Sequence, residues 1–315
     1  MPELPEVETI RRQLAPGVTG KRIVSAEVLD ERLTRPLPPG PVARGLEGRE
    51  IEAVERRGKY LLIRLEGEGT LALHLRMTGN VLVRSPDRLG APRLYESSTE
   101  PRFLRARFGL DDGTEILFTD VRRFGTAVLL EGADALDEYL STRVGIEPLS
   151  TDLTPEALGR IAEGRAAPLK SFLLTQTGVA GIGNIYADEA LHRAELHPLS
   201  PAGSMKHEHL EALVGGIVDA LELGLAEGGS SIDDYLDARG ERGSMQDEFL
   251  VHTREGLPCP RCASARDERE EGVPTIERIV VGGRSTYFCP DCQVKLRKRP
   301  RRRKRRRVAP AGPPR

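Results

Sequence analysis

The apolar residues of the first half of the chain follow two different periods. Val7, Ile10 and Leu14 recur at helical spacing, and Pro16-Gly17 predicts the end of that helix. Between residues 23 and 130, short segments with alternating or β-branched character are separated by Gly and Pro. The clearest predicted strands are 51–54, 60–65, 70–77, 116–119 and 126–130. This pattern predicts an antiparallel β-sandwich or barrel, with the N-terminal helix packed on it and the first residues delivered to its edge.

Helical signals replace the strand pattern in the second half. The strand signals end within residues 131–151, and Thr154-Pro155 predicts an N-cap followed by proline at the first helical position, opening a helix to about Ala162. Further helices are predicted over 168–176, 184–192 and 205–225. Asn184 is expected to cap the second of these. Residues 228–247, rich in Gly, Ser and Asp, are predicted to form a mobile loop.

Composition excludes some classes of protein and leaves others open. The chain has 315 residues, of which 38% are hydrophobic, enough for two cores, and it contains no apolar run near the ~20 residues that span a bilayer. The N-terminus lacks the apolar stretch of a signal peptide, so a cytoplasmic protein with no membrane association is expected. The net charge of −1 conceals an asymmetry, because 12 bases lie from residue 295 onward and residues 1–294 hold 35 bases against 48 acids. If the folded body binds DNA, its bases must gather on one face. The basic run is expected to be a disordered arm that either adds weak phosphate contacts or only aids solubility.

The four cysteines form two Cys-x-x-Cys pairs, Cys259/Cys262 and Cys289/Cys292. Two such pairs can supply four thiolates to one tetrahedral Zn²⁺, whereas a single redox-active pair would leave the other without a role. The 26 intervening residues exceed the usual 15–20, and 263–272 is interpreted as an insertion before a β-hairpin over 276–288. The hairpin turns at Gly282-Gly283 and places Arg284 at its tip. One structural zinc ion is therefore predicted.

The first eight residues, Met-Pro-Glu-Leu-Pro-Glu-Val-Glu, admit two interpretations. If Met1 is removed, Pro2 becomes a secondary amine that titrates near neutrality and can attack a sugar aldehyde carbon to give an iminium ion. Glu3 would then handle protons on the same sugar. The alternative is a plain helix start, since proline is favoured at the first helical position and glutamate in the first turn.

Further motifs decide between these interpretations. They are Arg56-Arg57-Gly58-Lys59-Tyr60, His74-Leu75-Arg76-Met77-Thr78-Gly79, Asp120-Val121-Arg122-Arg123-Phe124-Gly125 and Gly181-Ile182-Gly183-Asn184-Ile185-Tyr186. Taken in order with Pro2-Glu3 and the cysteine pairs, the set resembles the formamidopyrimidine-DNA glycosylase family from Pro2 to about Gln293. The glycines near 181 faintly match a dinucleotide-binding loop, but a helix precedes them where that loop requires a strand.

The resemblance implies a role for each matching residue. Pro2 would be the Schiff-base nucleophile and Glu3 the proton donor, with Glu6 in support. Lys59 would contact phosphate or donate the proton for β-elimination, and Arg284 would do the same for δ-elimination. The implied DNA contacts are Met77, Arg122, Arg123, Phe124, Lys170 and Asn184. Met77, Arg122 and Phe124 would fill the gap left by an everted base. Without the resemblance, Met77 could close a core row, Phe124 could be buried, and the lysines and Arg284 could be solvated.

The expected fold class is α+β: an N-terminal antiparallel β-sandwich with an N-terminal helix, then a helix–two-turn–helix domain and a β-hairpin zinc finger. The expected boundaries are 1–133, a linker at 134–150, 151–254, 255–294, and a basic tail at 295–315. The resemblance implies a monomeric DNA glycosylase and apurinic/apyrimidinic lyase of base excision repair, associated with the nucleoid. It would excise 8-oxoguanine and formamidopyrimidines from double-stranded DNA without a redox cofactor. Two alternatives are the endonuclease VIII branch, which prefers oxidised pyrimidines, and a non-catalytic DNA-binding protein that retains the hairpin and helices.

Overall fold

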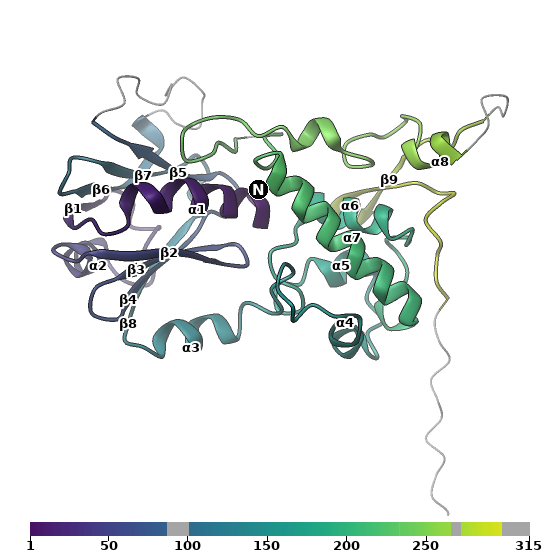
Figure 1. The fold of residues 1–315 in the computed structure, drawn as a ribbon, viewed down its shortest axis with the longest axis horizontal. Helices are drawn as coiled ribbons and strands as arrows, with labels where there is room; N and C mark the ends of the chain where they lie inside the picture. Colours follow the sequence, from purple (N-terminus) through teal and green to yellow (C-terminus); the bar gives the residue numbers. More distant parts are fainter. Residues whose placement is uncertain (87–100, 233, 266–271, 298–315) are drawn as a thin grey trace, which may run out of the picture.

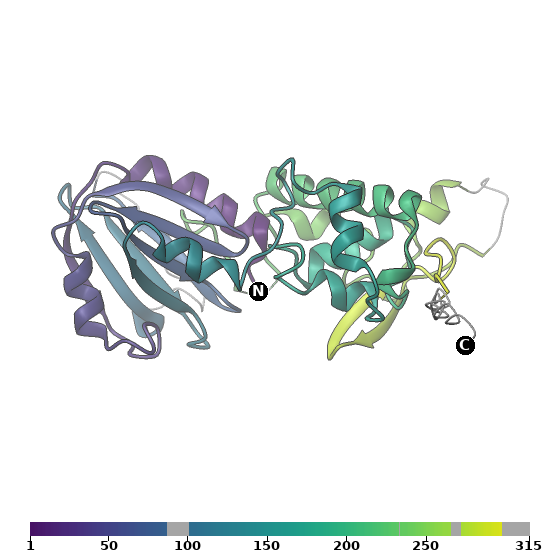
Figure 2. The ribbon, with the colours of Figure 1, turned by 90° about the horizontal axis from the view of Figure 1, so that it is seen from below.

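The computed structural model describes residues 1–86, 101–232, 234–265 and 272–297. The predictions for the basic tail beyond residue 297 and for most of the insertion at 263–272 therefore lie outside the described residues. The chain forms two lobes, and the N-terminus lies where they meet (Figures 1 and 2). No described helix is both long and apolar enough to cross a bilayer.

The N-terminal lobe is a sandwich of two antiparallel four-stranded sheets. One sheet has the order β1 (Ile23–Val28), β6 (Leu104–Leu110), β7 (Glu115–Asp120), β5 (Gly79–Arg84). The other has the order β2 (Ile51–Arg57), β3 (Tyr60–Leu65), β4 (Gly69–His74), β8 (Thr126–Glu131). The accompanying helices are α1 (Leu4–Val18), α2 (Pro39–Leu46), α3 (Ala135–Ser141) and the 3₁₀ turn η1 (Pro101–Phe103).

Helix α1 packs against both sheets along its predicted apolar face. Val7, Ile10 and Leu14 are fully buried in the core shared by the two sheets. The predicted end of the helix at Pro16-Gly17 is wrong, because the helix continues to Val18. A proline in the last turn costs one backbone hydrogen bond, and the burial of Val18 offsets that loss. The packing directs the N-terminal end of α1 toward the second lobe (Figure 1).

The second lobe is helical, as predicted, and carries the hairpin. Its elements are α4 (Pro155–Ala162), α5 (Leu169–Leu173), α6 (Asn184–Arg193), η2 (Ala202–Ser204), α7 (His207–Ala226), η3 (Met245–Glu248), α8 (Pro260–Ala265), β9 (Glu277–Val281) and β10 (Arg284–Phe288). The Thr154 hydroxyl accepts the Ala157 N–H at 3.1 Å, which confirms the predicted cap of α4. Helices α6 and α7 pack together, and β9 and β10 project from this lobe (Figure 2). The α+β fold class is confirmed.

The segment 228–247 is more tightly packed than its composition predicts. It leaves α7 and returns to the N-terminal lobe, where Tyr235, Leu236 and Ala238 are at most 5% exposed. The Asn80 side chain donates to the carbonyl of Asp234 and accepts the N–H of Leu236. We call this segment the strap, because it ties the helical lobe to the sandwich.

Candidate active site and zinc site

Glu3 joins the two lobes through the start of α6. Its carboxylate is 1% exposed and accepts the backbone N–H groups of Gly183, Ile185 and Tyr186 at 2.6, 3.0 and 3.4 Å. These are the unpaired donors of a helix N-terminus, which favours a negative charge. Asn184 was predicted to cap this helix, but it is the first helical residue, and the Glu3 carboxylate satisfies the donors in its place.

Two glycines make this approach possible. A Cβ on Gly183 would lie 2.3 Å from the carboxyl carbon of Glu3, so a side chain there would displace the carboxylate. Gly181 has φ +79° and accepts the N–H of Leu4 at 3.0 Å. Its Cβ would lie 2.7 Å from the Leu4 side chain. The glycines of this turn therefore serve to admit the N-terminus of α1.

Glu6 forms the second layer of the site. Its carboxylate accepts the Glu3 N–H at 2.7 Å, the Tyr186 hydroxyl at 2.8 Å and the Ser230 N–H at 2.8 Å. Burial raises the pKa of Glu6, and the neighbouring Glu3 carboxylate raises it further. Glu6 thus joins α1, α6 and the beginning of the strap, and its supporting role in the reaction stays a prediction.

Lys59 lies beside these carboxylates at the turn between β2 and β3. It is 5% exposed, and its ammonium makes no hydrogen bond with any residue that the structure describes. Burial lowers the pKa of Lys59, the charges of Glu3 and Glu6 oppose this shift, and Arg284 reinforces it. An unpaired buried ammonium near a carboxylate pair is suited to hold an anion or to exchange a proton.

A cavity of about 350 Å³ opens in front of Glu3. Its lining includes Met1, Met77, Asn184 and Arg284, so it brings residues of both lobes and the hairpin together. Pro2 is buried while Met1 precedes it. The structure therefore groups Glu3, Met77, Asn184 and Arg284, which the sequence predicted from separate motifs.

Two apolar side chains are exposed beside this cavity. Met77 is 40% exposed and Phe124 is 51% exposed. The Arg122 guanidinium connects them, because it lies 3.0 Å from the Met77 sulfur and 4.8 Å from the Phe124 ring centroid. The alternatives of a core methionine and a buried phenylalanine are therefore wrong, and the exposure fits a wedge. Arg123 pairs with Asp30 and lowers the pKa of that carboxyl to about 2.

Lys170 and Asn184 hold the helical lobe together. Lys170 has no exposed surface, and its ammonium lies 2.7 Å from Asp188 and 2.6 Å from the carbonyl of Asn184. The predicted DNA contact by Lys170 therefore does not fit this structure, since Asp188 and the helix backbone already use the charge. The Asn184 amide donates to the carbonyl of Ser285, which lies next to the turn of the hairpin.

The four cysteines meet as predicted. Their sulfur atoms all lie within 4.8 Å of one another, with Cys259 and Cys292 3.9 Å apart and Cys262 and Cys289 3.7 Å apart. A tetrahedral zinc ion at ~2.3 Å from each sulfur requires separations of about 3.8 Å, so the residues fit one structural Zn²⁺. His192 of α6 places Nε2 3.4 Å from the Cys259 sulfur. This contact ties the zinc site to the helix that Glu3 caps.

Three residues near the cavity have roles that the sequence did not predict. His252 lines the cavity, and Asp188 accepts a hydrogen bond from its ring. Glu147 accepts the Gly58 N–H at 2.9 Å and so fixes the turn that carries Lys59. Asp188 lies one helical turn after Asn184, a spacing that could have indicated a shared face. No local pattern distinguishes His252.

Comparisons with known proteins match most of the chain. Residues 1–127 match the family model of the formamidopyrimidine-DNA glycosylase N-terminal domain, residues 144–235 match its H2TH domain, and residues 275–294 match a zinc finger found in FPG and IleRS. A formamidopyrimidine-DNA glycosylase of Chloroflexus aurantiacus is 43% identical over 94% of this chain and 99% of its own length. One from Paracoccus denitrificans is 42% identical over 93% and 100%.

Solved structures agree with these matches. A Lactococcus lactis Fpg bound to DNA containing an abasic site superposes with a TM-score of 0.79 at 32% identity, covering 93% of this chain and all (100%) of that one. A MutM bound to DNA with carbocyclic 8-oxo-G gives a TM-score of 0.79 at 33% identity, with coverage of 93% and 100%. Three domain matches in order, near-complete coverage and a common fold leave one assignment: the chain belongs to the formamidopyrimidine-DNA glycosylase family.

Proposed function

We propose that this protein is a bifunctional DNA glycosylase and apurinic/apyrimidinic lyase of base excision repair that excises oxidised purines from double-stranded DNA. The observation that carries the proposal is the position of the Glu3 carboxylate. It lies at the start of α6 and lines a cavity that also contains Arg284 and Met77. A buried carboxylate, an adjacent terminal amine and a basic rim are the parts that excision at a sugar carbon requires.

In this mechanism, removal of Met1 frees the Pro2 amine next to Glu3. The amine attacks C1′ of the everted nucleotide, Glu3 moves the proton on the sugar, and loss of the base leaves an iminium ion. The iminium withdraws electrons and allows elimination of the phosphates on both sides. Lys59 and Arg284 hold those phosphates, because both are cationic and neither forms an ion pair with a described residue.

Met77, Arg122 and Phe124 would act in the recognition of the damaged base. Everting a base costs a few kcal/mol, and apolar side chains inserted into the stack offset part of that cost. Met77 and Phe124 are exposed on adjacent turns with Arg122 between them, and this arrangement fits insertion opposite the everted base. We further propose that the protein acts as a monomer on chromosomal DNA at the nucleoid.

Borohydride trapping tests the proposal. The full chain, with zinc bound and Met1 removed, is incubated with a duplex carrying 8-oxoguanine opposite cytosine, and the cross-linked peptide is mapped by mass spectrometry. A covalent adduct on Pro2 is expected. A preparation that binds this DNA but gives no adduct would favour a non-catalytic binding protein, and faster excision of thymine glycol than of 8-oxoguanine would favour the pyrimidine branch.

A further inference from the structure

The cavity in front of Glu3 contains an imidazole that the proposed mechanism does not use. His252 lines this cavity together with Asn184, Arg284 and Ser285. It comes from the segment that follows the strap, whereas Arg284 and Ser285 come from β10. The side chain is 8% exposed in the free protein, so only a small part of the ring faces the cavity.

Buried carboxylates of α6 fix the orientation of this ring. Nδ1 of His252 lies 2.8 Å from Asp188, whose other oxygen receives the Lys170 ammonium at 2.7 Å. A carboxylate can only accept, so Nδ1 carries the proton. Glu189 accepts the backbone N–H of His252 at 3.0 Å. The imidazole ring packs edge-on against the Tyr287 ring, with 5.1 Å between the centroids. Nε2 makes no hydrogen bond with any described residue and is left for the cavity.

This geometry separates two functions that one residue could not perform together. A guanidinium is a bidentate anion ligand, but it does not give up a proton at neutral pH. An imidazole titrates near neutrality and is the usual general acid in proteins. The cavity holds one of each, with the imidazole oriented by an acid as in other acid–base sites.

We propose that His252 is the general acid of the second elimination, in which the 5′ phosphate departs, while Arg284 binds that phosphate without donating a proton. This inference rests on the function proposed above. Asp188 acts as a positioning residue that holds the ring with Nε2 toward the leaving oxygen.

A carbon–hydrogen bond of the sugar breaks, and its proton passes to water. The electron pair of that bond forms a new carbon–carbon double bond conjugated with the Pro2 iminium. The carbon–oxygen bond to the phosphate breaks, its pair goes to the phosphate oxygen, and that oxygen takes the proton from Nε2. The neutral imidazole recovers a proton from solvent.

Charged groups lie on each element around His252. Asp188 of α6 contacts the ring, and Glu189 of α6 accepts the backbone N–H of His252. Lys170 of α5 pairs with Asp188, and Arg284 of β10 and Glu3 line the same cavity. Because a general acid must carry its proton, the second cut is expected to slow as pH rises through the range in which imidazoles generally lose theirs, about pH 5 to 8.

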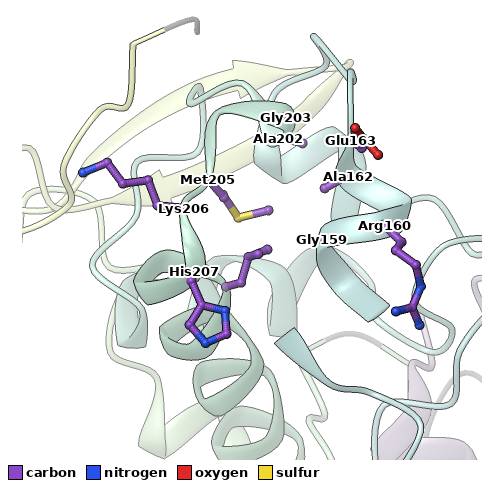
Figure 3. A pocket seen from close by; sticks show the side chains of 10 residues that line it. Gly159, Arg160, Ala162, Glu163, Ala202, Gly203, Met205, Lys206 and His207 are labelled. Carbon is purple, nitrogen blue, oxygen red and sulfur yellow. The ribbon is translucent and has the colours of Figure 1, made fainter. Parts of the chain in front are cut away.

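The experiment separates the two cuts in the full-length, zinc-loaded protein. An 8-oxoguanine duplex labelled on the damaged strand is followed over time from pH 5 to 8 for the parent, His252→Asn and Asp188→Asn, with borohydride trapping in parallel. His207→Gln is the matched control, because His207 lines a separate pocket with Arg160 and Glu163 (Figure 3). It is the first residue of α7, whereas the strap follows the last.

His252→Asn is expected to lose about 10²-fold in the rate of the second cut, the low end of general-acid effects, and to lose its pH dependence. Trapping and the first cut are expected to persist. Asp188→Asn, which keeps the imidazole, is expected to show a smaller loss with a displaced pH profile. His207→Gln is expected to match the parent.

Other outcomes overturn the proposal in distinguishable ways. A second cut that keeps the parent rate and pH profile in His252→Asn would sink this role while leaving the proposed function intact. So would an equal loss of trapping and of both cuts. A His252→Asn protein that does not fold shifts the decision to Asp188→Asn, where an unchanged profile refutes the role. Failure of the parent itself to trap would remove the proposed function and this inference together.

Discussion

At the scale of single residues, Gly183 decides whether Glu3 reaches its place. An alanine Cβ would lie 2.3 Å from the Glu3 carboxyl carbon, so either the carboxylate or the start of α6 must move. Gly183→Ala is expected to lower the trapping rate roughly 10²-fold and the free energy of unfolding by about 1–3 kcal/mol, because buried donors lose their acceptor. Single-turnover trapping and urea unfolding measure the two effects.

Gly215→Ala is the matched control for that substitution. Gly215 is exposed on α7, and a Cβ there meets no atom within 4 Å. Alanine in the interior of a helix is expected to stabilise the protein by about 0.5–1 kcal/mol without affecting trapping. Parent-like trapping and stability in Gly183→Ala would show that Glu3 tolerates the displacement, and that the close approach is not required.

His74 gives the protein a pH-dependent stability. Burial lowers the pKa of His74 to about 3, and the charges of Arg76 and Lys59 contribute. The unfolded chain, with an ordinary histidine pKa of ~6.5, binds the proton more readily. The stabilisation is therefore complete above about pH 6.5 and is lost as pH falls from there toward 3, by up to about 1.4 kcal/mol per pH unit.

His74→Gln tests this dependence while keeping an acceptor for the Arg76 N–H, which lies 3.0 Å from Nδ1. Urea unfolding is measured from about pH 5 to 6.5, above the range in which ordinary carboxylates titrate. The parent is expected to lose stability toward pH 5 more steeply than the variant. Identical slopes would mean that His74 accepts a proton in the folded protein at its ordinary pKa.

The sequence identifies which residues are chemically suited to the site better than it identifies the residues they contact. The chemistry of Glu3 and of the cysteines is visible in short motifs, whereas Glu6 is implied only by the family resemblance. The family resemblance implies the DNA contacts of Lys170 and Asn184, and for Asn184 a helix N-terminus that attracts phosphate supports the contact. In the free protein the two side chains contact Asp188 and Ser285, which lie 18 and 101 residues away. Spacing carries no signal for contacts of that length.

At the scale of elements, the prediction succeeded where periodicity was long or capping was complete. β3 and α4 were predicted with their observed ends, because a nearly continuous apolar run after Gly58-Lys59 marks the first and a Thr-Pro cap marks the second. β1, β5, β6, α2 and α3 were not predicted. Their sequences are short or rich in Gly, Pro and charge, and they form because neighbours pair with them. In β6, for instance, Ala106 and Phe108 are buried between two partner strands.

The zinc site stabilises the hairpin as an element. Removal of the metal with a chelator is expected to release one zinc per chain and to unfold the hairpin, because zinc contributes ~10–16 kcal/mol to folding in small domains of this kind. Arg284 and the Asn184–Ser285 contact would be lost with it, so DNA binding should fall at least tenfold. Metal analysis, hydrogen exchange of 277–288 and a binding titration measure this.

The sandwich provides an internal control for that experiment. Its core contains no zinc ligand, so hydrogen exchange in β3 and β4 is expected to remain unchanged after chelation. Restoration of binding by added zinc would exclude irreversible damage. Full retention of hairpin protection without metal would show that packing alone holds β9 and β10.

At the scale of the whole molecule, arginines without an acidic partner lie at the junction of the two lobes. Residues 1–294 carry an excess of acids, yet Arg122 and Arg284 form no ion pair with a described residue. Many other arginines are neutralised, among them Arg56, which pairs with Glu8 and Glu147. Arg122 and Arg284 thus place positive charge that no described acid neutralises at and beside the cavity, as DNA binding by an acidic body requires.

Release of the strap is expected to affect both lobes, because the strap contacts Asn80 of the sandwich and Glu6 at the active site. Asn80 is fully buried, and its amide satisfies the Asp234 carbonyl at 3.1 Å and the Leu236 N–H at 3.0 Å. Asn80→Ala leaves both backbone groups unpaired, at about 1–3 kcal/mol each. Because Ser230, near the start of the strap, donates its backbone N–H to Glu6, release of the strap should also loosen the site. We expect faster hydrogen exchange at 234–238 and a several-fold lower trapping rate, with β3 and the interior of α7 unaffected.

Asp219→Asn, on the exposed face of α7, is the control for Asn80→Ala and should match the parent in both measurements. If exchange at 234–238 accelerates while trapping stays constant, the strap holds the lobes together without positioning the carboxylates, and Glu6 and the start of α6 must keep Glu3 in place without it.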